Sequence, residues 1–293
     1  MRLIVTGASS FVGAHLASRA VDRGHEVIAL HNSTPVDLPG ARSLSINLAK
    51  NASAGELRHL NADAVVHAAY RVISSSHRPP ESLLETNRAM MSTILDLALP
   101  TLYLSSTCVS WHPPTAYSEG RIDDEQRLRM SGLPHAILRP SAPYGPPHPH
   151  HTPRHEESFH RLANLIVRHR LAPLPGRGTL RQPIHVDDLS DASLNLLESG
   201  LPNLTLPAGG PEALTMEEIS RAIAHAAGGH CLAIPLPPAL LAFAARFTEG
   251  LDPDLLRSAA NEDLAPPEAL SAASGVTPRP FSEGLVDLLR TIS

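Results

Sequence analysis

The sequence of 293 residues contains almost no lysine, because its 24 basic side chains are 23 arginines and the single Lys50. Any mechanism that needs a lysine amine therefore has one candidate. The 2 cysteines exclude a disulfide scaffold, and a reducing cytoplasm is the expected location. No run of about 18 apolar residues occurs and the N-terminus lacks the pattern of a secretory signal, so we expect no membrane-spanning segment.

The chain also lacks an excess of positive charge, since its formal net charge is −5 and its pI is about 6.4. Nucleic acids and anionic lipid surfaces are recognised by basic fields. We therefore expect neither as a partner and favour a small-molecule substrate. At about 100–200 residues per domain, the length allows one large domain or a main domain with a smaller companion.

The first 140 residues alternate between short apolar runs and longer segments with helical spacing. Between the runs, Phe11–Arg19 and Glu81–Leu99 have apolar residues three and four positions apart. A repeated strand–helix–strand order predicts an α/β fold with a Rossmann-type doubly wound parallel sheet over residues 1–140. The expected buried parallel strands are Leu3–Val5, Val27–Leu30, Ala64–His67, Leu102–Leu104 and Ala136–Leu138.

The pattern changes after Pro140, where prolines cluster as far as Pro153 and predict irregular backbone. We expect residues 141–293 to form a smaller mixed lobe that supplies the substrate side of a cleft. Its strand and helix near residues 180–207 are expected to return to the main sheet. The helices expected in this lobe are Glu156–Arg170, Asp187–Ser199, Met216–Ala227 and Pro238–Thr248.

The segment from Leu3 to Gly13 runs from the first strand through small residues into the first helix. A dinucleotide pyrophosphate needs backbone N–H groups at a helix N-terminus without a Cβ in the way. Gly7 can supply the tight turn and Gly13 the close helix packing, whereas Ser10 replaces the usual middle glycine. An ordinary strand-to-helix turn is the alternative. The residues expected to touch the cofactor here are Gly7, Ser10, Phe11, Val12 and Gly13.

No carboxylate stands at the end of the second strand, where an NAD-binding fold has its ribose selector. The position holds His31, Asn32 and Ser33, which can donate hydrogen bonds to a 2′-phosphate, and Arg42 could approach from the following loop. A neutral site permits this phosphate without requiring it. We therefore favour NADP(H) over NAD(H).

Several segments together resemble the extended short-chain dehydrogenase/reductase family of nucleotide-sugar epimerases, dehydratases and ketoreductases. They run in the family order from residue 3 to about residue 190, and Phe281–Leu285 also fits. Besides the glycine turn they are Asp63–Ala69, Asn87, Tyr103–Val109, Tyr117–Arg121, Leu138–Pro140 with Tyr144–Pro146, and Arg181–Asp188.

The resemblance implies further contacts with the cofactor and a possible homodimer. The dimer would form through the helices at Glu81–Leu99 and Tyr117–Ser131. His67 is expected to pack beside the cofactor instead of acting as a base. The further cofactor contacts implied are Asn47, Leu48, His67, Ala68, Ala69, Asn87 and Pro140, in addition to Tyr117 and Arg121.

The resemblance also implies that Ser106 and Tyr117 are catalytic and that Arg121 occupies the place of the family's lysine. Hydride transfer to a carbonyl leaves an alkoxide that must be protonated. Tyr117 can donate that proton, and Ser106 can hold the carbonyl oxygen. A cation four residues after the tyrosine lies on the same helix face and lowers the phenol pKa. An arginine keeps its proton, however, so it cannot pass one on as a lysine can. The alternatives are a surface tyrosine and a helix-face cation.

Within the family, dehydratases place Thr-Asp-Glu where this chain has Ser106, Thr107 and Cys108, and epimerases usually carry the acidic ribose selector. These departures favour an NAD(P)H-dependent ketoreductase that acts on the 4-keto group of a nucleotide-linked deoxysugar. The alternatives are a nucleotide-sugar epimerase, a reductase of a non-sugar ketone or aldehyde, and a non-catalytic NAD(P)-binding module.

The substrate side is implied by Tyr70, Thr107 and Arg181, of which Arg181 resembles the family arginine that grips the substrate diphosphate. Two departures favour the non-sugar alternative. Ala142 stands where sugar-nucleotide enzymes usually carry a substrate-binding asparagine, and the interval from Ser106 to Tyr117 is only 11 residues.

Histidines cluster between residues 148 and 160, but Pro153 opposes the helix that would bring them onto one face. We expect a solvated proline-rich loop and no metal site. Asp187 and Asp188 are interpreted as the charge and cap of a helix N-terminus. The clustered histidines are His148, His150, His151, His155 and His160.

Overall fold

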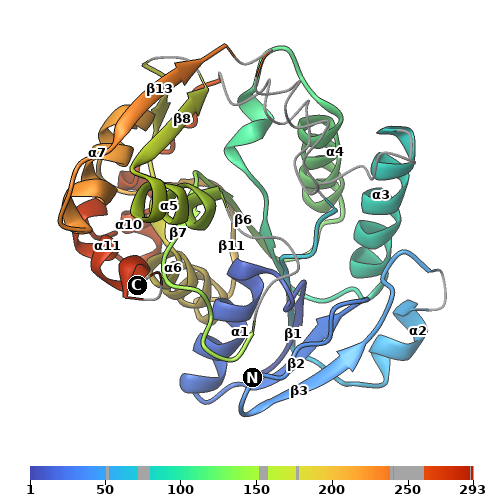
Figure 1. Cartoon of the computed structure of the whole chain (residues 1–293). Coiled ribbons are helices and arrows are strands. Elements are labelled where there is room, and N and C mark those ends of the chain that lie inside the picture. Colours follow the sequence, from blue (N-terminus) through green and yellow to red (C-terminus); the bar gives the residue numbers. More distant parts are fainter. Residues whose placement is uncertain are drawn as a thin grey trace.

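The computed structural model describes residues 1–50, 53–71, 80–151, 158–175, 178–237, 240, 261–290 and 292. At its centre is a seven-stranded sheet with the order β11-β6-β5-β4-β1-β2-β3, parallel in every pairing (Figure 1). This sheet confirms the Rossmann-type doubly wound fold. Its strands are β1 (Arg2–Thr6), β2 (Glu26–His31), β3 (Ala41–Ser45), β4 (Ala64–His67), β5 (Thr101–Leu104), β6 (His135–Pro140) and β11 (Pro202–Ala208).

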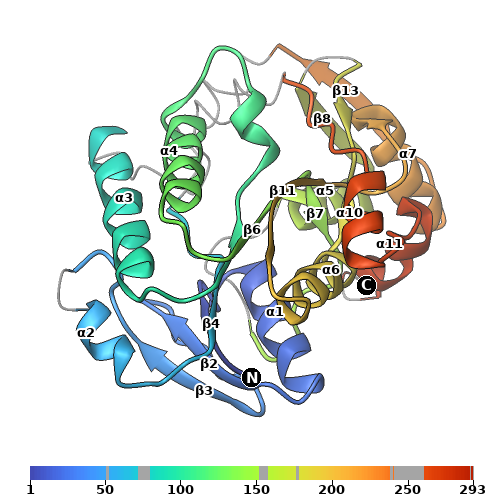
Figure 2. The ribbon, with the colours of Figure 1, turned by 180° about the vertical axis from the view of Figure 1, so that it is seen from behind.

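Helices cover both faces of the sheet (Figures 1 and 2). Leu3 and Val5 of β1 belong to the core under one helical layer, and Ile4 between them belongs to the core under the other. Because both faces are buried, the central strands are mainly apolar instead of alternating. The first layer contains α1 (Phe11–Asp22), α6 (Val186–Glu198) and α10 (Glu268–Ser274), and the second contains α2 (Ser53–Arg58), α3 (Pro80–Asp96) and α4 (Ala116–Met130).

A third apolar core lies in the C-terminal half, where Tyr144, Phe159 and Phe281 pack against one another. The division of the chain at residue 140 remains a proposal. This half contains α5 (Ser158–His169), α7 (Met216–Ala226), α11 (Phe281–Leu289) and the parallel pair β8 (Leu171–Pro175) and β13 (Leu232–Leu236). Its two-residue strands are β7 (Pro143–Tyr144), which pairs with β10 (Ile184–His185), and β9 (Leu180–Arg181), which pairs with β12 (Leu214–Thr215).

Strand β3 and helix α2, at the edge of the sheet, were not predicted from the sequence. Strand β3 is polar and largely exposed, so it carries little apolar signal. Arg42 therefore lies within a strand opposite Ile28, and the expected position in a loop was wrong. The helix expected at Pro238–Thr248 lies outside the described residues except for Leu240.

The expectation of a solvated histidine loop was also wrong for three of its members. The ring of His148 is hydrogen-bonded to the Ser18 hydroxyl at 2.9 Å, and His151 and His160 donate to the carbonyls of Ser9 (2.9 Å) and Gly145 (2.8 Å). All three rings are buried, whereas His150 is exposed and His155 lies outside the described residues. These partners lie in α1 (Ser18), in the turn before it (Ser9) and directly after Tyr144 (Gly145), and the local sequence around the histidines does not reveal them.

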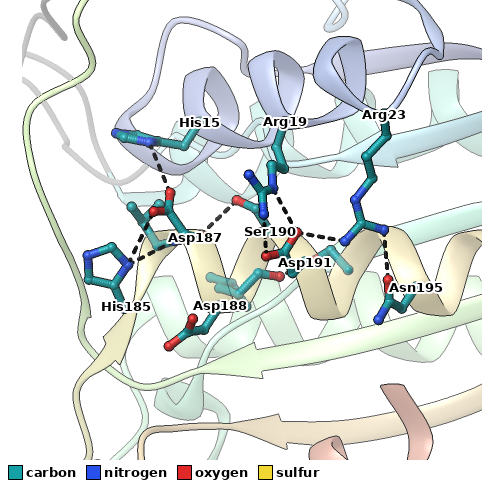
Figure 3. Close-up of polar contacts among 12 residues, drawn as sticks. His15, Arg19, Arg23, His185, Asp187, Asp188, Ser190, Asp191 and Asn195 are labelled. Atoms are coloured by element: carbon teal, nitrogen blue, oxygen red, sulfur yellow. Dashed lines mark hydrogen bonds and ion pairs between the residues drawn. The ribbon is translucent and has the colours of Figure 1, made fainter. Parts of the chain in front are cut away.

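Helices α1 and α6 are joined by a row of polar contacts (Figure 3). Asp191 accepts hydrogen bonds from Arg19 Nε (2.8 Å) and Arg23 Nη2 (2.6 Å). At the start of α6, the Asp187 carboxylate (Oδ1) lies 3.8 Å from His15 Nδ1. The residue that caps this helix is His185, not an aspartate, because its Nδ1 accepts from the Asp187 N–H. The row fixes α6 against the helix that follows the glycine turn.

Acid is expected to destabilise the fold through the buried side chains of His15, His148 and His185. Burial lowers the pKa of His15 and His185, and it lowers that of His148 to about 4. Because the unfolded chain then binds more protons, stability is complete above the ordinary value of 6.5 and is lost as the pH falls towards about 4. Urea unfolding at several pH values across this window measures the loss.

A matched pair of variants assigns this pH dependence. His148→Gln should reduce the slope of unfolding free energy against pH, whereas His59→Gln, at an exposed position, should leave it unchanged. Unfolding free energies that stay constant across the window would contradict the expectation.

Candidate functional site

The glycine turn after β1 is built as a nucleotide-binding turn requires. Gly7 has φ +67°, and a Cβ on it would lie 2.7 Å from backbone atoms of Ala69. A Cβ on Gly13 would lie 2.1 Å from the Gly7 carbonyl oxygen. Ser10 caps α1 and locks the turn, because its hydroxyl accepts from Gly13 N–H (3.1 Å) and donates to the Gly7 carbonyl (2.8 Å). The replacement of the middle glycine by Ser10 therefore preserves the turn.

Replacing Gly13 by alanine is expected to weaken nucleotide binding by more than tenfold and to lower the free energy of unfolding by about 1–3 kcal/mol. The added Cβ meets a backbone carbonyl, so α1 must move away from the turn. Gly55→Ala is the control, since its Cβ would meet open space on helix α2. Calorimetric nucleotide titration and urea unfolding measure both effects. A Gly13→Ala protein that matches the Gly55→Ala protein would refute this account of the turn.

The end of β2 carries no carboxylate, and His31 takes the selector position. His31 is partly buried, and its Nδ1 has no hydrogen-bond partner among the described residues. Asn32 and Ser33 are exposed beside it. An unpaired ring nitrogen with two exposed polar neighbours fits a ribose hydroxyl or a phosphate. Arg42 pairs with Ile28, three residues before the strand end, so it does not form part of this cluster.

The segment after β3 holds Asn47, Leu48 and Lys50. The carbonyls of Asn47 and Leu48 accept hydrogen bonds from Ser53 (2.7 Å) and Thr93 (2.7 Å), which fixes the segment between α2 and α3. The Lys50 N–H donates to the Asn47 carbonyl at 3.0 Å, and its side chain is exposed. Lys50 is therefore separate from the Tyr117 cluster described below.

The segment after β4 is held from two sides. The Thr6 hydroxyl is hydrogen-bonded to His67 Nδ1 (2.8 Å) and accepts from the Ala69 N–H (3.1 Å). Burial, together with the charge of Arg121, lowers the pKa of His67 to about 3, so His67 is neutral near neutral pH and is a weak base. Ala68, between them, packs against the core on the α1 side.

Asn87 of α3 is occupied by the backbone of this same segment. Its Oδ1 accepts from the Arg71 N–H at 2.8 Å, and its Nδ2 donates to the Arg71 carbonyl at 3.1 Å. The side chain is buried and binds both polar groups of one residue. Asn87 therefore sets the course of the chain beside the nucleotide turn, and a direct contact with the cofactor remains a proposal.

The structure brings Ser106, Tyr117 and Arg121 together at the carboxyl end of β5. Ser106 caps the short helix η1 (Thr107–Ser110), and Tyr117 lies in the first turn of α4, which Thr115 caps. Arg121 follows one turn later, with its Cζ 5.5 Å from the centre of the Tyr117 ring. Burial raises the pKa of Tyr117, whereas the charge of Arg121 and hydrogen bonding with Ser106 lower it.

Arg121 is buried and firmly anchored. Its Nη1 donates to the Leu104 carbonyl and, at 3.1 Å, to the Tyr103 hydroxyl. Its Cζ lies 3.7 Å from the centre of the Tyr70 ring, a close cation–π contact. Its Nε has no partner among the described residues. A buried cation with an unmet donor beside Tyr117 fits a hydroxyl-rich ligand such as the nicotinamide ribose.

Tyr70 was expected to contact the substrate, but its side chain contacts other residues of the protein. Its hydroxyl donates to the Tyr117 carbonyl at 3.2 Å, where Gly120 leaves room for it. Burial raises the pKa of Tyr70 far above its usual value. The ring therefore supports Arg121 and α4, and a contact with substrate remains a proposal.

Asp263 is a site residue that was not predicted from the sequence. Its Oδ1 accepts from the Thr107 hydroxyl (2.9 Å) and from the Trp111 indole (2.7 Å). Its Oδ2 lies 3.2 Å from Arg181 Nε. Asp263 stands 156 residues after Thr107, so only the fold brings them together. The Trp111 ring extends this cluster to Tyr117, at a centre-to-centre distance of 6.2 Å.

Three other expected residues border the same region. Arg181 is buried and also donates to the carbonyls of Leu180 (2.9 Å) and Asn261. The Pro140 carbonyl accepts from the Thr107 hydroxyl at 3.4 Å. Ala142 has φ +42°, a left-handed backbone that asparagine adopts more readily than alanine.

Comparison with known proteins confirms the family resemblance. Residues 3–125 match the sequence profile of the NAD dependent epimerase/dehydratase family. Over 261 residues the chain is 24% identical to the dTDP-4-dehydro-6-deoxy-D-allose reductase of Streptomyces bikiniensis, which covers 75% of this chain and 79% of that protein. The matched family is one of enzymes, and it is the same family that the motifs indicated.

Solved structures show the same fold over the whole length. The UDP-glucose 4-epimerase of Thermotoga maritima with UDP-glucose has a TM-score of 0.77 at 18% identity, covering 99% of this chain and 98% of that one. The UDP-glucose 4-epimerase of Thermus thermophilus in complex with NAD has a TM-score of 0.77 at 21% identity, covering 100% and 99%. In the part of the chain that the structure describes, no helix is both long and apolar enough to cross a membrane.

Proposed function

We propose that the protein is an NAD(P)H-dependent ketoreductase. The observation that carries this proposal is the cluster of Ser106, Tyr117 and Arg121 in a fold whose glycine turn is sterically restricted to glycine at Gly7 and Gly13. No carboxylate accompanies Ser106 at Thr107 or Cys108, so the acid–base pair for elimination of water is absent at these positions.

The proposed mechanism assigns one task to each side chain. The nicotinamide cofactor supplies the hydride that reduces the carbonyl carbon. Ser106 donates a hydrogen bond to the carbonyl oxygen, and Tyr117 gives its phenolic proton to the oxygen as negative charge develops there. Arg121 stabilises the resulting tyrosinate with a permanent charge. Its buried Nε is the donor available to the nicotinamide ribose.

NADP(H) is the favoured cofactor because the selector position is neutral. The α1 N-terminus would hold the pyrophosphate, and His31, Asn32 and Ser33 would face the adenosine ribose. Calorimetric titration with NADPH and NADH tests this choice. Tighter binding of NADPH supports it, tighter binding of NADH reverses it, and binding of neither nucleotide overturns the proposed function.

The favoured substrate is the 4-keto group of a nucleotide-linked deoxysugar. Support comes from the activity for which the Streptomyces bikiniensis relative is named and from the contact that Arg181 and Thr107 both make with Asp263. A guanidinium is suited to a diphosphate because it offers paired donors. Steady oxidation of NADPH with a dTDP-4-ketosugar tests the assignment.

A second candidate, an uncharged ketone or aldehyde, is favoured by the pairing of Arg181 with Asp263. This carboxylate balances the charge of Arg181 and would repel a diphosphate. Arg181→Ala should raise KM by about tenfold for a dTDP-4-ketosugar and leave a simple ketone unaffected if the nucleotide is bound there. Arg221→Ala, at an exposed position, is the control. Turnover of simple ketones alone would favour the second candidate.

A further inference from the structure

Behind Arg121 lies a buried row of hydrogen bonds that the proposed chemistry does not use. Arg121 Nη1 donates to the Tyr103 hydroxyl at 3.1 Å, and this hydroxyl donates to Asp124 Oδ2 at 3.2 Å. Tyr103 is 0% exposed and Asp124 is 1% exposed. The donors and acceptors all point in one direction, from the guanidinium through the phenol to the carboxylate.

The row joins two elements of the fold. Tyr103 comes from β5, and Arg121 and Asp124 lie three residues apart on one face of α4. The other charges near the Asp124 carboxylate are those of Asp123 and Arg127. Asp123 pairs with Arg88 of α3, and Arg127 donates to the Arg88 carbonyl and to the Ser92 hydroxyl of α3.

A buried arginine needs more hydrogen-bond acceptors, in more fixed positions, than a buried lysine. Its guanidinium carries five N–H donors in a rigid plane, whereas an ammonium carries three that rotate freely. The Leu104 carbonyl and the Tyr103 hydroxyl are the two acceptors given to Nη1. Of these two, only the Tyr103 hydroxyl leads on to a carboxylate.

We propose that Asp124, acting through Tyr103, is a positioning residue that fixes the Arg121 guanidinium beside Tyr117. This inference rests on the proposed function of Tyr117 and Arg121. Asp124 supplies the acceptor at the end of the row, which holds the Tyr103 hydroxyl hydrogen away from Arg121 and leaves the oxygen free to accept from Arg121 Nη1. The substitution of arginine for the family's lysine is thereby accommodated by a residue three positions further along the same helix.

The row is expected to respond to pH. Burial raises the pKa of Asp124 to about 7, while the charge of Arg121 and the Tyr103 hydrogen bond act in the opposite direction. Above this pH the carboxylate is ionised and accepts a stronger, charge-assisted hydrogen bond from Tyr103. Arg121 is then held more firmly, so nucleotide affinity should rise as the pH increases through about 7.

Two measurements test the positioning role. Neither needs turnover, and the second needs no bound nucleotide. The first is calorimetric nucleotide affinity as a function of pH. The second is ultraviolet titration of tyrosinate, with the Tyr117→Phe protein as the blank. Burial raises the pKa of the other three tyrosines far above the usual value, so Tyr117 is expected to ionise first. The three are Tyr70, Tyr103 and Tyr144.

Asp124→Ala and Tyr103→Phe should each weaken nucleotide binding about tenfold and raise the pKa of Tyr117 by about one pH unit, because a hydrogen bond in a charged row is lost. Tyr103→Phe removes only one oxygen and keeps the ring in the core. Asp124→Asn retains an acceptor and should restore most of the affinity, but without the change near pH 7. Asp123→Ala, at the adjoining surface pair, is the matched control.

If Asp124→Ala and Asp123→Ala gave the same nucleotide affinity and the same pKa of Tyr117, the proposal would be overturned. A change of affinity near pH 7 that persists in Asp124→Asn would overturn the assignment of that change to this carboxylate. If the wild-type protein reduces no ketone and binds no nucleotide, the proposed function fails. The tyrosinate titration still decides whether Asp124 positions Arg121.

Discussion

Replacing Tyr117 by phenylalanine is expected to lower kcat by about 10²–10⁴-fold and to change nucleotide affinity by less than about threefold. The variant loses the proton donor and keeps the ring beside Trp111 and Tyr70. Steady-state NADPH oxidation with a ketone panel, together with calorimetric nucleotide titration, separates the two effects. A loss confined to kcat identifies Tyr117 as the general acid.

Tyr144→Phe is the matched control for this substitution. The Tyr144 hydroxyl is also buried, but it donates to the Phe281 carbonyl at 3.3 Å in the C-terminal core. This variant should keep kcat within about twofold and lose about 1 kcal/mol of stability. Equal kcat values for the two variants would remove Tyr117 from the mechanism. Nucleotide binding without turnover of any ketone by the unmodified protein would instead favour a binding module.

Replacing Glu125 by alanine is expected to lower the free energy of unfolding by about 3–5 kcal/mol. Glu125 is 1% exposed and accepts two hydrogen bonds from Arg139 (2.9 and 2.6 Å). It also accepts from the Ser105 hydroxyl (2.6 Å) and Arg129 (3.0 Å). Its removal leaves the Ser105 hydroxyl and the Arg139 guanidinium without their partner. Urea unfolding measures the loss.

Glu119→Ala controls for the loss of a carboxylate from the same helix. Glu119 is exposed in the first turn of α4, so its removal should change stability by less than about 0.5 kcal/mol. Glu125 links β5, β6 and α4 next to the Tyr117 cluster. A Glu125→Ala protein as stable as the Glu119→Ala protein would show that this buried network contributes little.

The sheet could be predicted because its central strands are buried on both faces and therefore carry continuous apolar runs. β1, β4 and β5 stand out in the sequence for this reason. β3 does not, because an exposed edge strand needs few apolar side chains. Apolar patterns in the sequence reflect burial, so an exposed strand or helix is difficult to predict from them.

The candidate site was predictable only where its chemistry is local. Tyr117 and Arg121 share one helix face, and Gly7 and Gly13 share one turn, so spacing alone relates them. The partners Asp263 and Tyr103 come from distant elements, and their contacts depend on the packing of side chains. The buried setting of His151 has the same origin, since its acceptor is the Ser9 carbonyl 142 residues away.

Because the sequence contains one lysine, its side chain can be labelled selectively. Lys50 is exposed directly after the Asn47–Leu48 segment, so the chain offers amine-reactive reagents one side chain and the N-terminal amine. That amine lies 3.4 Å from His25 Nδ1, at the amino end of the sheet. A fluorophore coupled to Lys50 would sit beside the expected adenosine end of the cofactor, where its emission could report nucleotide occupancy without a mutation.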